Sequence, residues 1–316
     1  MVGDRGSLAA EARPLQPRLT LSAAAARPNL ESPSTIASGP TMPDLLLSVR
    51  DALAPRYRVE RPLGRGGMAT VFLAQRADGG GPVAVKVLHR GLAVALGTDR
   101  FHREIEILSR LRHPHIVPVF DSDIAGTFVF LVMPYVAGEN LRTRIQREGQ
   151  LPIHSALSIA RDVAGALDYA HAQNVLHRDI KPENILLEGD RALVCDFGLA
   201  RAIDRSTMDS SSSGLVVGTP AYMSPEQAMA QKDIGPQSDV YALGCVLYEM
   251  LTGELPFTGP TAQAILARHL AVPPRPLGIV RPDLPEHIEA AVAAALAKSP
   301  DERPASGAEL SRRLTG

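Results

Sequence analysis

The chain has 316 residues, of which 45% are hydrophobic and 21% charged, and its formal net charge is −1. This length suits one large domain or two coupled lobes, and the near-neutral charge gives no electrostatic basis for binding nucleic acid or an anionic membrane. Two cysteines, Cys195 and Cys245, exclude a disulfide framework, and no stretch has the roughly 20 apolar residues that cross a bilayer. We therefore expect a cytoplasmic protein with no membrane segment and no nucleic-acid partner.

The first segment lacks the pattern of a folded element. Residues 1–42 are rich in Ala, Pro, Ser and Arg and show no sustained period of 2 or 3.6 residues. This composition predicts a disordered leader, or a start codon placed ahead of the true start at Met42. Residues 43–56 contain "LLLSVRDAL", whose helical period predicts a helical lead-in.

A strand-rich part comes next, followed by a helix-rich part. Residues 57–136 read as strands interrupted by a glycine turn and by one helix at 99–111. After Gly138, apolar residues recur at three- and four-residue steps, most clearly over 151–174, and further helices follow. This order predicts an α+β fold with a small β-rich N-lobe, containing one main helix, and a larger helical C-lobe.

A glycine cluster lies between the first two predicted strands. In "LGRGGMATV" (63–71), Gly64, Gly66 and Ala69 have the spacing of a G-x-G-x-x-G loop, in which glycines let backbone N–H groups approach a phosphate. The same cluster also fits a plain hairpin turn. Because a strand rather than a helix follows from Val71, a nucleotide-binding loop here would be a hairpin lid and not a dinucleotide-binding turn.

The next strand carries a single lysine among apolar residues. In "VAVK" (83–86), Lys86 either faces solvent, which is common, or neutralises a bound anion. Glu104 on the following helix has the charge to hold the Lys86 ammonium in place. The pair alone does not decide between these two readings.

Two loops combine carboxylates with an amide. "HRDIKPEN" (177–184) supplies Asp179 and Asn184, and "LVCDFGLA" (193–200) supplies Asp196 after a short apolar strand. Hard oxygen ligands of this kind suit Mg²⁺ that carries phosphates. Turn capping could explain any one of these polar groups, but it explains all of them poorly beside a lysine and a glycine lid.

These motifs occur together in the order of a known signature set. "GRGGMATV", "VAVK", "HRDIKPEN", "DFG" and "GTPAYMSPE" follow the order and approximate spacing of the protein-kinase motifs. Over about residues 57–313 the chain resembles the eukaryotic-like Ser/Thr protein kinases, particularly their bacterial members. The resemblance implies a bilobal kinase fold, with the N-lobe at about 57–136 and the C-lobe at about 137–313. It also implies transfer of the ATP γ-phosphate to Ser/Thr hydroxyls, with Mg²⁺ as the metal and Mn²⁺ as a possible substitute.

The resemblance assigns the phosphate and metal contacts. Lys86 would contact the α- and β-phosphates of ATP, held by an ion pair with Glu104. Asn184 and Asp196 would bind Mg²⁺. Asp179 would orient the acceptor hydroxyl and accept its proton.

Other residues of the same loop receive supporting roles from the resemblance. Lys181 would lie beside the γ-phosphate, which goes with Ser/Thr rather than Tyr acceptors. His177 is expected to be a core residue stacked near Phe197. Arg178 would pair with a phosphate on the activation loop and order it.

The resemblance also implies an adenine site. Main-chain groups of Pro134 and Val136 would bond the base, and Met133 would shape the back of the pocket. Cys195 would be a small apolar filler. The complete nucleotide site would comprise Leu63, Gly64, Arg65, Gly66, Gly67, Met68, Ala69, Val71, Ala84, Lys86, Met133, Pro134, Val136 and Leu186.

The segment from about Leu199 to Met223 matches an activation loop. Its serine run fits a flexible linker, and beside Arg178 it also fits a site of self-activating autophosphorylation. Thr219 would support Ser/Thr specificity, Glu226 would pair with Arg303, and Asp239 would bond the backbone of the catalytic loop. The candidate phosphosites are Ser206, Thr207, Ser210, Ser211, Ser212 and Ser213.

Three other readings compete with an active protein kinase. A pseudokinase scaffold would lack Lys86, Asp179 or Asp196, and all three are present. A small-molecule phosphotransferase would lack the "GTPAYMSPE" segment that shapes a peptide groove. An interaction module acting through the Pro-rich leader has only composition in its favour. The expected partners are therefore Ser/Thr-bearing protein substrates and the kinase itself, with an N-lobe dimer as a possibility seen in relatives.

Overall fold

The N-terminal part of the protein is a five-stranded antiparallel sheet. The computed structural model describes residues 42–67, 69–89, 105–197 and 219–316. Strands follow in the order β1-β2-β3-β5-β4, and β2 pairs with β3 so that Val71 faces Lys86. The five strands are β1 (Tyr57–Arg65), β2 (Ala69–Arg76), β3 (Pro82–Leu88), β4 (Asp121–Ala125) and β5 (Phe128–Pro134).

Apolar side chains cover both faces of this sheet. Val85 and Phe130 belong to a cluster on one face, whereas Leu88 and Leu131 belong to the main core on the other, together with Ile105. Strands buried on both faces read as near-continuous apolar runs, and "VAVKVL" in β3 is such a run. Lys86 is the polar interruption in this run, and its position is therefore set by the sheet.

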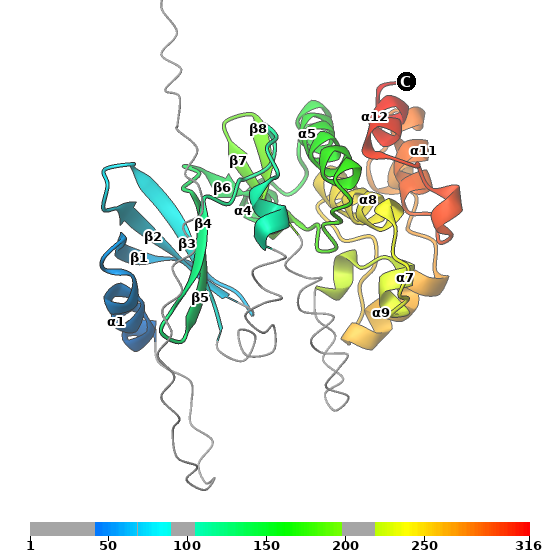
Figure 1. The fold of residues 1–316 in the computed structure, drawn as a ribbon. Helices are drawn as coiled ribbons and strands as arrows, with labels where there is room; N and C mark the ends of the chain where they lie inside the picture. The colour runs from blue at the N-terminus through cyan, green and yellow to red at the C-terminus, as the bar shows by residue number, and fades with distance from the viewer. Residues whose placement is uncertain (1–41, 68, 90–104, 198–218) are drawn as a thin grey trace, which may run out of the picture.

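Helix α1 (Met42–Leu53) covers the first of these faces and lies beside β1 (Figure 1). Val49 and Leu53 are fully buried in the cluster, 0% and 1% exposed. Arg50 donates from Nε to Val59 O at 2.9 Å and from its terminal nitrogen to Glu60 O at 2.5 Å. These are carbonyls of the edge strand β1, so α1 both fills the apolar face and caps the sheet edge.

The C-terminal part is helical around one buried helix. From Ser238 to Thr252 every residue of α8 (Pro236–Thr252) is buried, as expected for a helix that is apolar all round. Among the described helices, none combines the length and apolarity needed to cross a bilayer. The other helices are α4 (Leu141–Glu148), α5 (Ile153–Ala172), α7 (Pro225–Ala228), α9 (Ala262–Ala271), α10 (Leu277–Val280), α11 (Glu286–Ala295) and α12 (Gly307–Thr315).

A small second sheet lies on the side of the helical part nearest the large sheet (Figure 1). It contains β6 (Glu139–Asn140), β7 (Ile185–Glu188) and β8 (Arg191–Val194), in the order β6-β7-β8. The short 3₁₀ turn η1 (Pro182–Asn184) leads into β7. The predicted α+β fold with a β-rich N-lobe and a helical C-lobe is therefore confirmed.

Candidate active site

A buried aspartate holds the loop before η1 by its backbone. Asp239, 1% exposed, accepts the N–H of His177 at 2.9 Å and the N–H of Arg178 at 2.8 Å. His171 Nε2 lies 2.7 Å from the same carboxylate. Burial opposes ionisation of Asp239, but His171 and the backbone N–H groups outweigh it and lower its pKa. Arg178 has a φ of +67°, a left-handed conformation that this carboxylate helps to maintain.

His177 is a core residue of this loop. It is fully buried, and its ring packs edge-on against Phe197 with the centroids 4.6 Å apart. Nε2 lies 2.9 Å from Cys195 O, and Nδ1 accepts the N–H of Asp179 at 3.2 Å. Both ring nitrogens are therefore committed to the main chain, which leaves neither for shuttling a proton.

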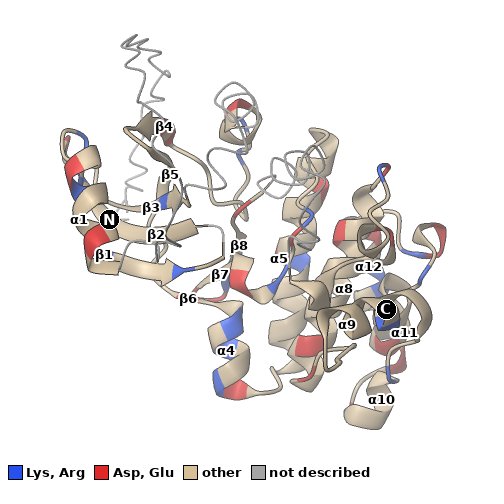
Figure 2. Cartoon of the chain, turned by 90° about the horizontal axis from the view of Figure 1, so that it is seen from below, with Lys and Arg blue, Asp and Glu red and all other residues tan. Residues whose placement is uncertain are grey.

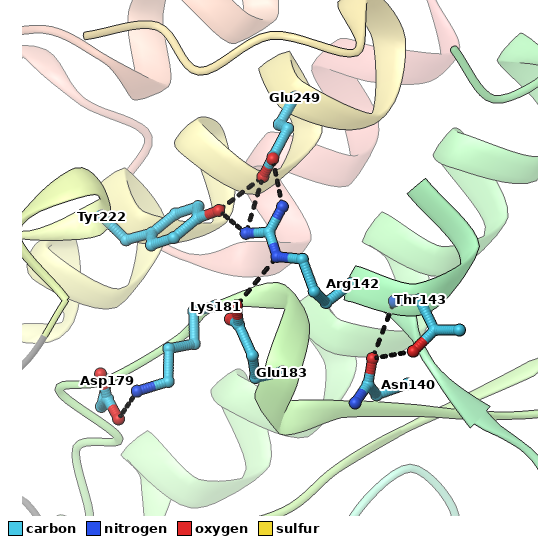
Figure 3. Close-up of polar contacts among 8 residues, drawn as sticks. All are labelled: Asn140, Arg142, Thr143, Asp179, Lys181, Glu183, Tyr222 and Glu249. Atoms are coloured by element: carbon cyan, nitrogen blue, oxygen red, sulfur yellow. Dashed lines mark hydrogen bonds and ion pairs between the residues drawn. The ribbon is translucent and has the colours of Figure 1, made fainter. Parts of the chain in front are cut away.

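Asp179 has its carboxylate oriented by two neighbours. Lys181 Nζ lies 2.6 Å from Oδ2 (Figure 3). Asn184 Nδ2 donates to Oδ2 at 3.2 Å and to Asp179 O at 2.8 Å. The Asn184 amide nitrogen is thus used within the loop, so its Oδ1 points the other way. A backbone bond of 3.0 Å from Cys195 N to Asn184 O links this loop to the residue before Asp196.

Lys86 and Asp196 meet across the two lobes. Nζ lies 2.7 Å from Oδ2, and the two side chains are 13% and 22% exposed. Burial would raise the pKa of Asp196, but the ammonium of Lys86 reverses the direction and lowers it. Asp196 has a φ of +68°, so its backbone adopts a left-handed conformation at this point. The predicted partner Glu104 lies outside the described residues.

The donor set near Asp196 fits a hard divalent cation. The Asp196 carboxylate and the Asn184 amide oxygen are oxygen ligands of the type that Mg²⁺ accepts, and the 3.0 Å backbone bond holds their segments together. Burial raises the pKa of the adjacent Cys195 thiol, which keeps it protonated and apolar in character. This agrees with Cys195 acting as a filler.

Three of the residues predicted to contact the base come together between the two lobes. Met133, Val136 and Leu186 pack against one small cluster that also contains Val117 and Cys195. A cavity that Met133 and Val117 also line is bounded by Asp196, Phe197 and further apolar residues from Leu108 to Leu131. Sequence reasoning missed Val117, which donates its N–H to Val194 O at 2.9 Å, beside the parallel bridge between Ile116 and Val194.

The glycine turn is open. Gly66 N donates to Ala69 O at 2.9 Å and closes the turn between β1 and β2. A Cβ added at Gly64 or Gly67 would meet no atom within 4 Å, and neither residue has a left-handed φ. Packing within the protein therefore leaves room for a side chain at these two positions, and glycine there lets a group outside the chain approach the backbone closely.

A charged network on the other side of Lys181 was not predicted. Arg142 Nε lies 2.8 Å from Glu183, and its terminal nitrogens contact Glu249 and the hydroxyl of Tyr222 (Figure 3). Tyr222 also donates to Glu249 at 2.5 Å. In sequence, Arg142 is one of several arginines on the basic helix α4 (Figure 2), which reads as a solvated surface. The sequence carries no signal that would have singled it out.

A second ion pair closes the C-lobe. Arg303 binds Glu226 with two parallel bonds of 2.7 and 2.9 Å, and the Arg303 side chain is 0% exposed. Burial opposes the charge on Glu226, but Arg303 and Ser238 outweigh it and lower the pKa of this carboxylate. Thr219 is half-buried directly before the turn η2 (Pro220–Tyr222). Several predicted residues lie outside the described residues: Met68, Glu104, Ser206, Thr207, Ser210, Ser211, Ser212 and Ser213.

Comparison with known proteins identifies the family. The protein kinase domain family matches residues 57–309. The serine/threonine-protein kinase pkn2 of Myxococcus xanthus is 38% identical over 267 residues, which cover 82% of this chain and 32% of that protein. PknB of Mycobacterium tuberculosis strain H37Rv is 40% identical over 264 residues, covering 82% and 42%. The chain thus spans less than half the length of these relatives.

The fold comparison agrees. A crystal structure of Rad53 residues 1–466 in complex with AMP-PNP has a TM-score of 0.70 to this chain at 25% identity, covering 83% of this chain and 65% of the other. Residues 57–309, which the family model matches, contain the glycine turn, Lys86, the loop around Asp179 and Asp196. The chain belongs to the protein kinase domain family, beside bacterial serine/threonine kinases.

Proposed function

We propose that this protein is an ATP-dependent serine/threonine protein kinase. The observation that carries the proposal is the pairing of Lys86 with Asp196 at 2.7 Å, next to a loop in which Lys181 and Asn184 both orient Asp179. Phosphoryl transfer needs positioned charges more than covalent chemistry by the protein. Lys86, Asp179 and Asp196 supply those charges, and the Asn184 amide adds a neutral oxygen ligand.

Lys86, Asn184 and Asp196 form the phosphate and metal side of the proposed site. Lys86 would bind the α- and β-phosphates, with Glu104 as its proposed second partner. Asn184 and Asp196 would hold Mg²⁺, or Mn²⁺ in its place. When bound, the metal supplies charge that neutralises the phosphate oxygens. The ammonium of Lys86, which keeps Asp196 ionised in the absence of a ligand, supports this assignment.

Asp179 and Lys181 form the acceptor side. Both contacts from Lys181 and Asn184 reach Oδ2 of Asp179, and within the described part of the chain no bond to Oδ1 is found. Oδ1 would therefore accept the proton of a Ser or Thr hydroxyl while Asn184 Nδ2 holds Oδ2. Lys181 would turn from Oδ2 toward the γ-phosphate when nucleotide is present.

The proposed nucleotide site uses the open glycine turn as its lid. Backbone N–H groups of residues 63–69 would approach the phosphates, and glycines at positions where packing leaves room for a side chain allow that approach. Main-chain groups of Pro134 and Val136 would bond adenine. Val71, Ala84, Met133 and Leu186 would enclose the ring.

Family membership supports further proposals on domain bounds and regulation. We propose a kinase domain over residues 57–313, with lobes at 57–136 and 137–313, after a lead-in at 43–56 and a leader at 1–42. Autophosphorylation between residues 199 and 223 would bring a phosphate to Arg178. We also propose protein substrates, a cytoplasmic location and dimerisation through the N-lobe.

Mass spectrometry after incubation with ATP and Mg²⁺ tests the proposal. We expect phosphate on Ser or Thr of the wild-type protein, mainly at 199–223, and none on an Asp179→Asn variant. An Asp51→Asn variant, altered at an exposed position of α1, is the matched control and should behave as wild type. ATP binding without phosphate on any protein, added substrates included, would instead indicate a scaffold.

A further inference from the structure

A histidine after β3 contacts the glycine turn. His89 Nδ1 lies 3.1 Å from Gly67 O, in the turn between β1 and β2. Its Nε2 lies 3.3 Å from Oγ1 of Thr70, the second residue of β2, which is fully buried. None of the kinase motifs discussed above includes His89, and Thr70, which lies within "GRGGMATV", was given no role there.

The chemistry of the two contacts fixes the tautomer. Gly67 O can only accept, so the proton of the neutral ring is on Nδ1. Nε2 is then unprotonated and accepts the hydroxyl proton of Thr70. Each ring nitrogen thus has one partner, and the imidazole bridges the turn to the strand.

The contacts of His89 reach the glycine turn where the turn makes few other hydrogen bonds. Within the described residues, the turn's own main-chain closure is the bond from Gly66 N to Ala69 O. Pairing between β2 and β3 ends at Ala69 and Leu88, directly before His89. His89 therefore extends the connection beyond the last strand pair, onto the turn itself, and it does so three residues after Lys86.

We propose that His89 is a positioning residue that latches the glycine lid to the strand carrying Lys86. This rests on the proposed ATP-binding function, because the lid and Lys86 are its two phosphate-binding parts. Ordering the lid before nucleotide arrives lowers the entropy lost on binding. The latch should therefore strengthen ATP binding and leave the transfer step nearly unchanged, since the reacting groups lie on the C-lobe.

Nucleotide affinity and turnover measured on matched variants test the latch. Of the two hydrogen bonds that His89→Ala removes, the one to Gly67 O reaches the turn, and losing one neutral hydrogen bond corresponds to about a threefold to tenfold change in affinity. We expect His89→Ala to raise the dissociation constant for Mg·ATP by that factor, measured by calorimetry, with the rate at saturating ATP within about twofold of wild type. His89→Asn keeps a donor near the Nδ1 position and should recover most of the affinity. His154→Ala, at an exposed position of α5, is the control.

Hydrogen exchange of the nucleotide-free protein gives a second readout that does not depend on activity. Amides of residues 64–70 should exchange faster in His89→Ala than in wild type or His154→Ala, and Thr70→Val should give a smaller increase. Unchanged exchange together with unchanged affinity would overturn the latch, as would a lowered melting temperature with neither of these effects. If wild type bound no ATP, the proposed function would fail, and the exchange experiment would still decide whether His89 holds the turn.

Discussion

Replacing Arg303 by Met should destabilise the C-lobe by about 3–5 kcal/mol. This is the usual cost of removing one partner of a buried ion pair, because the other charge stays buried and unpaired. Arg303 is 0% exposed and binds Glu226 through two bonds of 2.7 and 2.9 Å. Met has a similar shape, so the loss would be chiefly electrostatic and not a cavity.

The rest of the guanidinium is also in use, which places the expected value toward the upper part of this range. Nε donates to Ala297 O at 2.8 Å, and the terminal nitrogens donate to Gln237 O and Lys298 O, each at 3.0 Å. The charge lies 4.8 Å from the ring centroid of Tyr241. Three carbonyls would therefore lose a donor together with the carboxylate.

Thermal unfolding followed by circular dichroism measures the effect. For a protein of this size about 1 kcal/mol corresponds to a shift of 2–4 °C, so Tm should fall by about 6–20 °C. Adding Glu226→Gln should restore part of the loss, because the unpaired charge is then gone. A single variant within 1 °C of wild type, or a double variant no more stable than the single, would refute the reasoning.

The ion pair of Glu226 with Arg303 also predicts how Tm depends on pH. Although Glu226 is buried, Arg303 and Ser238 lower its pKa below the ordinary value of 4.5. When folding lowers the pKa of a carboxyl group, the ionised group stabilises the protein at pH values above its unfolded-state pKa. This stabilisation is lost as the pH falls through the folded-state pKa. The gap in Tm between wild type and Arg303→Met should thus be full at pH 7 and shrink below about pH 4.5. A gap that widened in acid would contradict this sign.

Three further predictions concern other parts of the molecule. Gly138→Ala should lower Tm by several degrees, because the added Cβ would lie 1.9 Å from Leu187 O. Gly64→Ala should leave Tm unchanged and weaken ATP binding, because its Cβ would meet no atom within 4 Å. Equal effects of the two variants on Tm would count against this contrast. Leu53→Ala should cost about 2–4 kcal/mol in urea unfolding, since Leu53 is a buried residue of α1 and only 1% exposed. Leu47→Ala, at an exposed position of the same helix, should cost less than about 1 kcal/mol. Similar losses would mean that α1 is not docked. Iodoacetamide at pH 8 should leave Cys195 and Cys245 unmodified until urea is added. Both thiols are buried, and burial raises the pKa of each. Rapid labelling of the folded protein would show that the thiols are accessible.

The sequence predicted the parts of this fold that depend on local pattern. The apolar run in β3 indicates a strand buried on both faces, and the run from Val240 to Leu251 indicates the buried helix α8. The order of the motifs identified Lys86, Asp179 and Asp196 because each has a recognisable local context. Their distances required the structure, because Lys86 and Asp196 are on different lobes.

Contacts between distant segments could not be predicted in this way. Arg142 joins Glu183, Tyr222 and Glu249, which are 41, 80 and 107 positions away in the sequence. Arg142, Glu183 and Tyr222 look like ordinary surface charges or an aromatic in their own segments. Glu249 stands out within the apolar run of α8, but nothing in its segment names its partners. Likewise, the contact of His89 with Gly67 depends on the register of β2 and β3 and has no sequence signature.

Comparing ATP affinity with turnover in wild type and Asp179→Asn tests the central claim most directly. The account assigns Asp179 to the acceptor hydroxyl, so the variant should transfer phosphate at least about 100-fold more slowly. Its dissociation constant for Mg·ATP should stay within about threefold of wild type, because Asp179 acts on the acceptor and not on nucleotide binding. An equal loss of affinity and turnover, or turnover left intact, would contradict the assignment and with it the proposed mechanism.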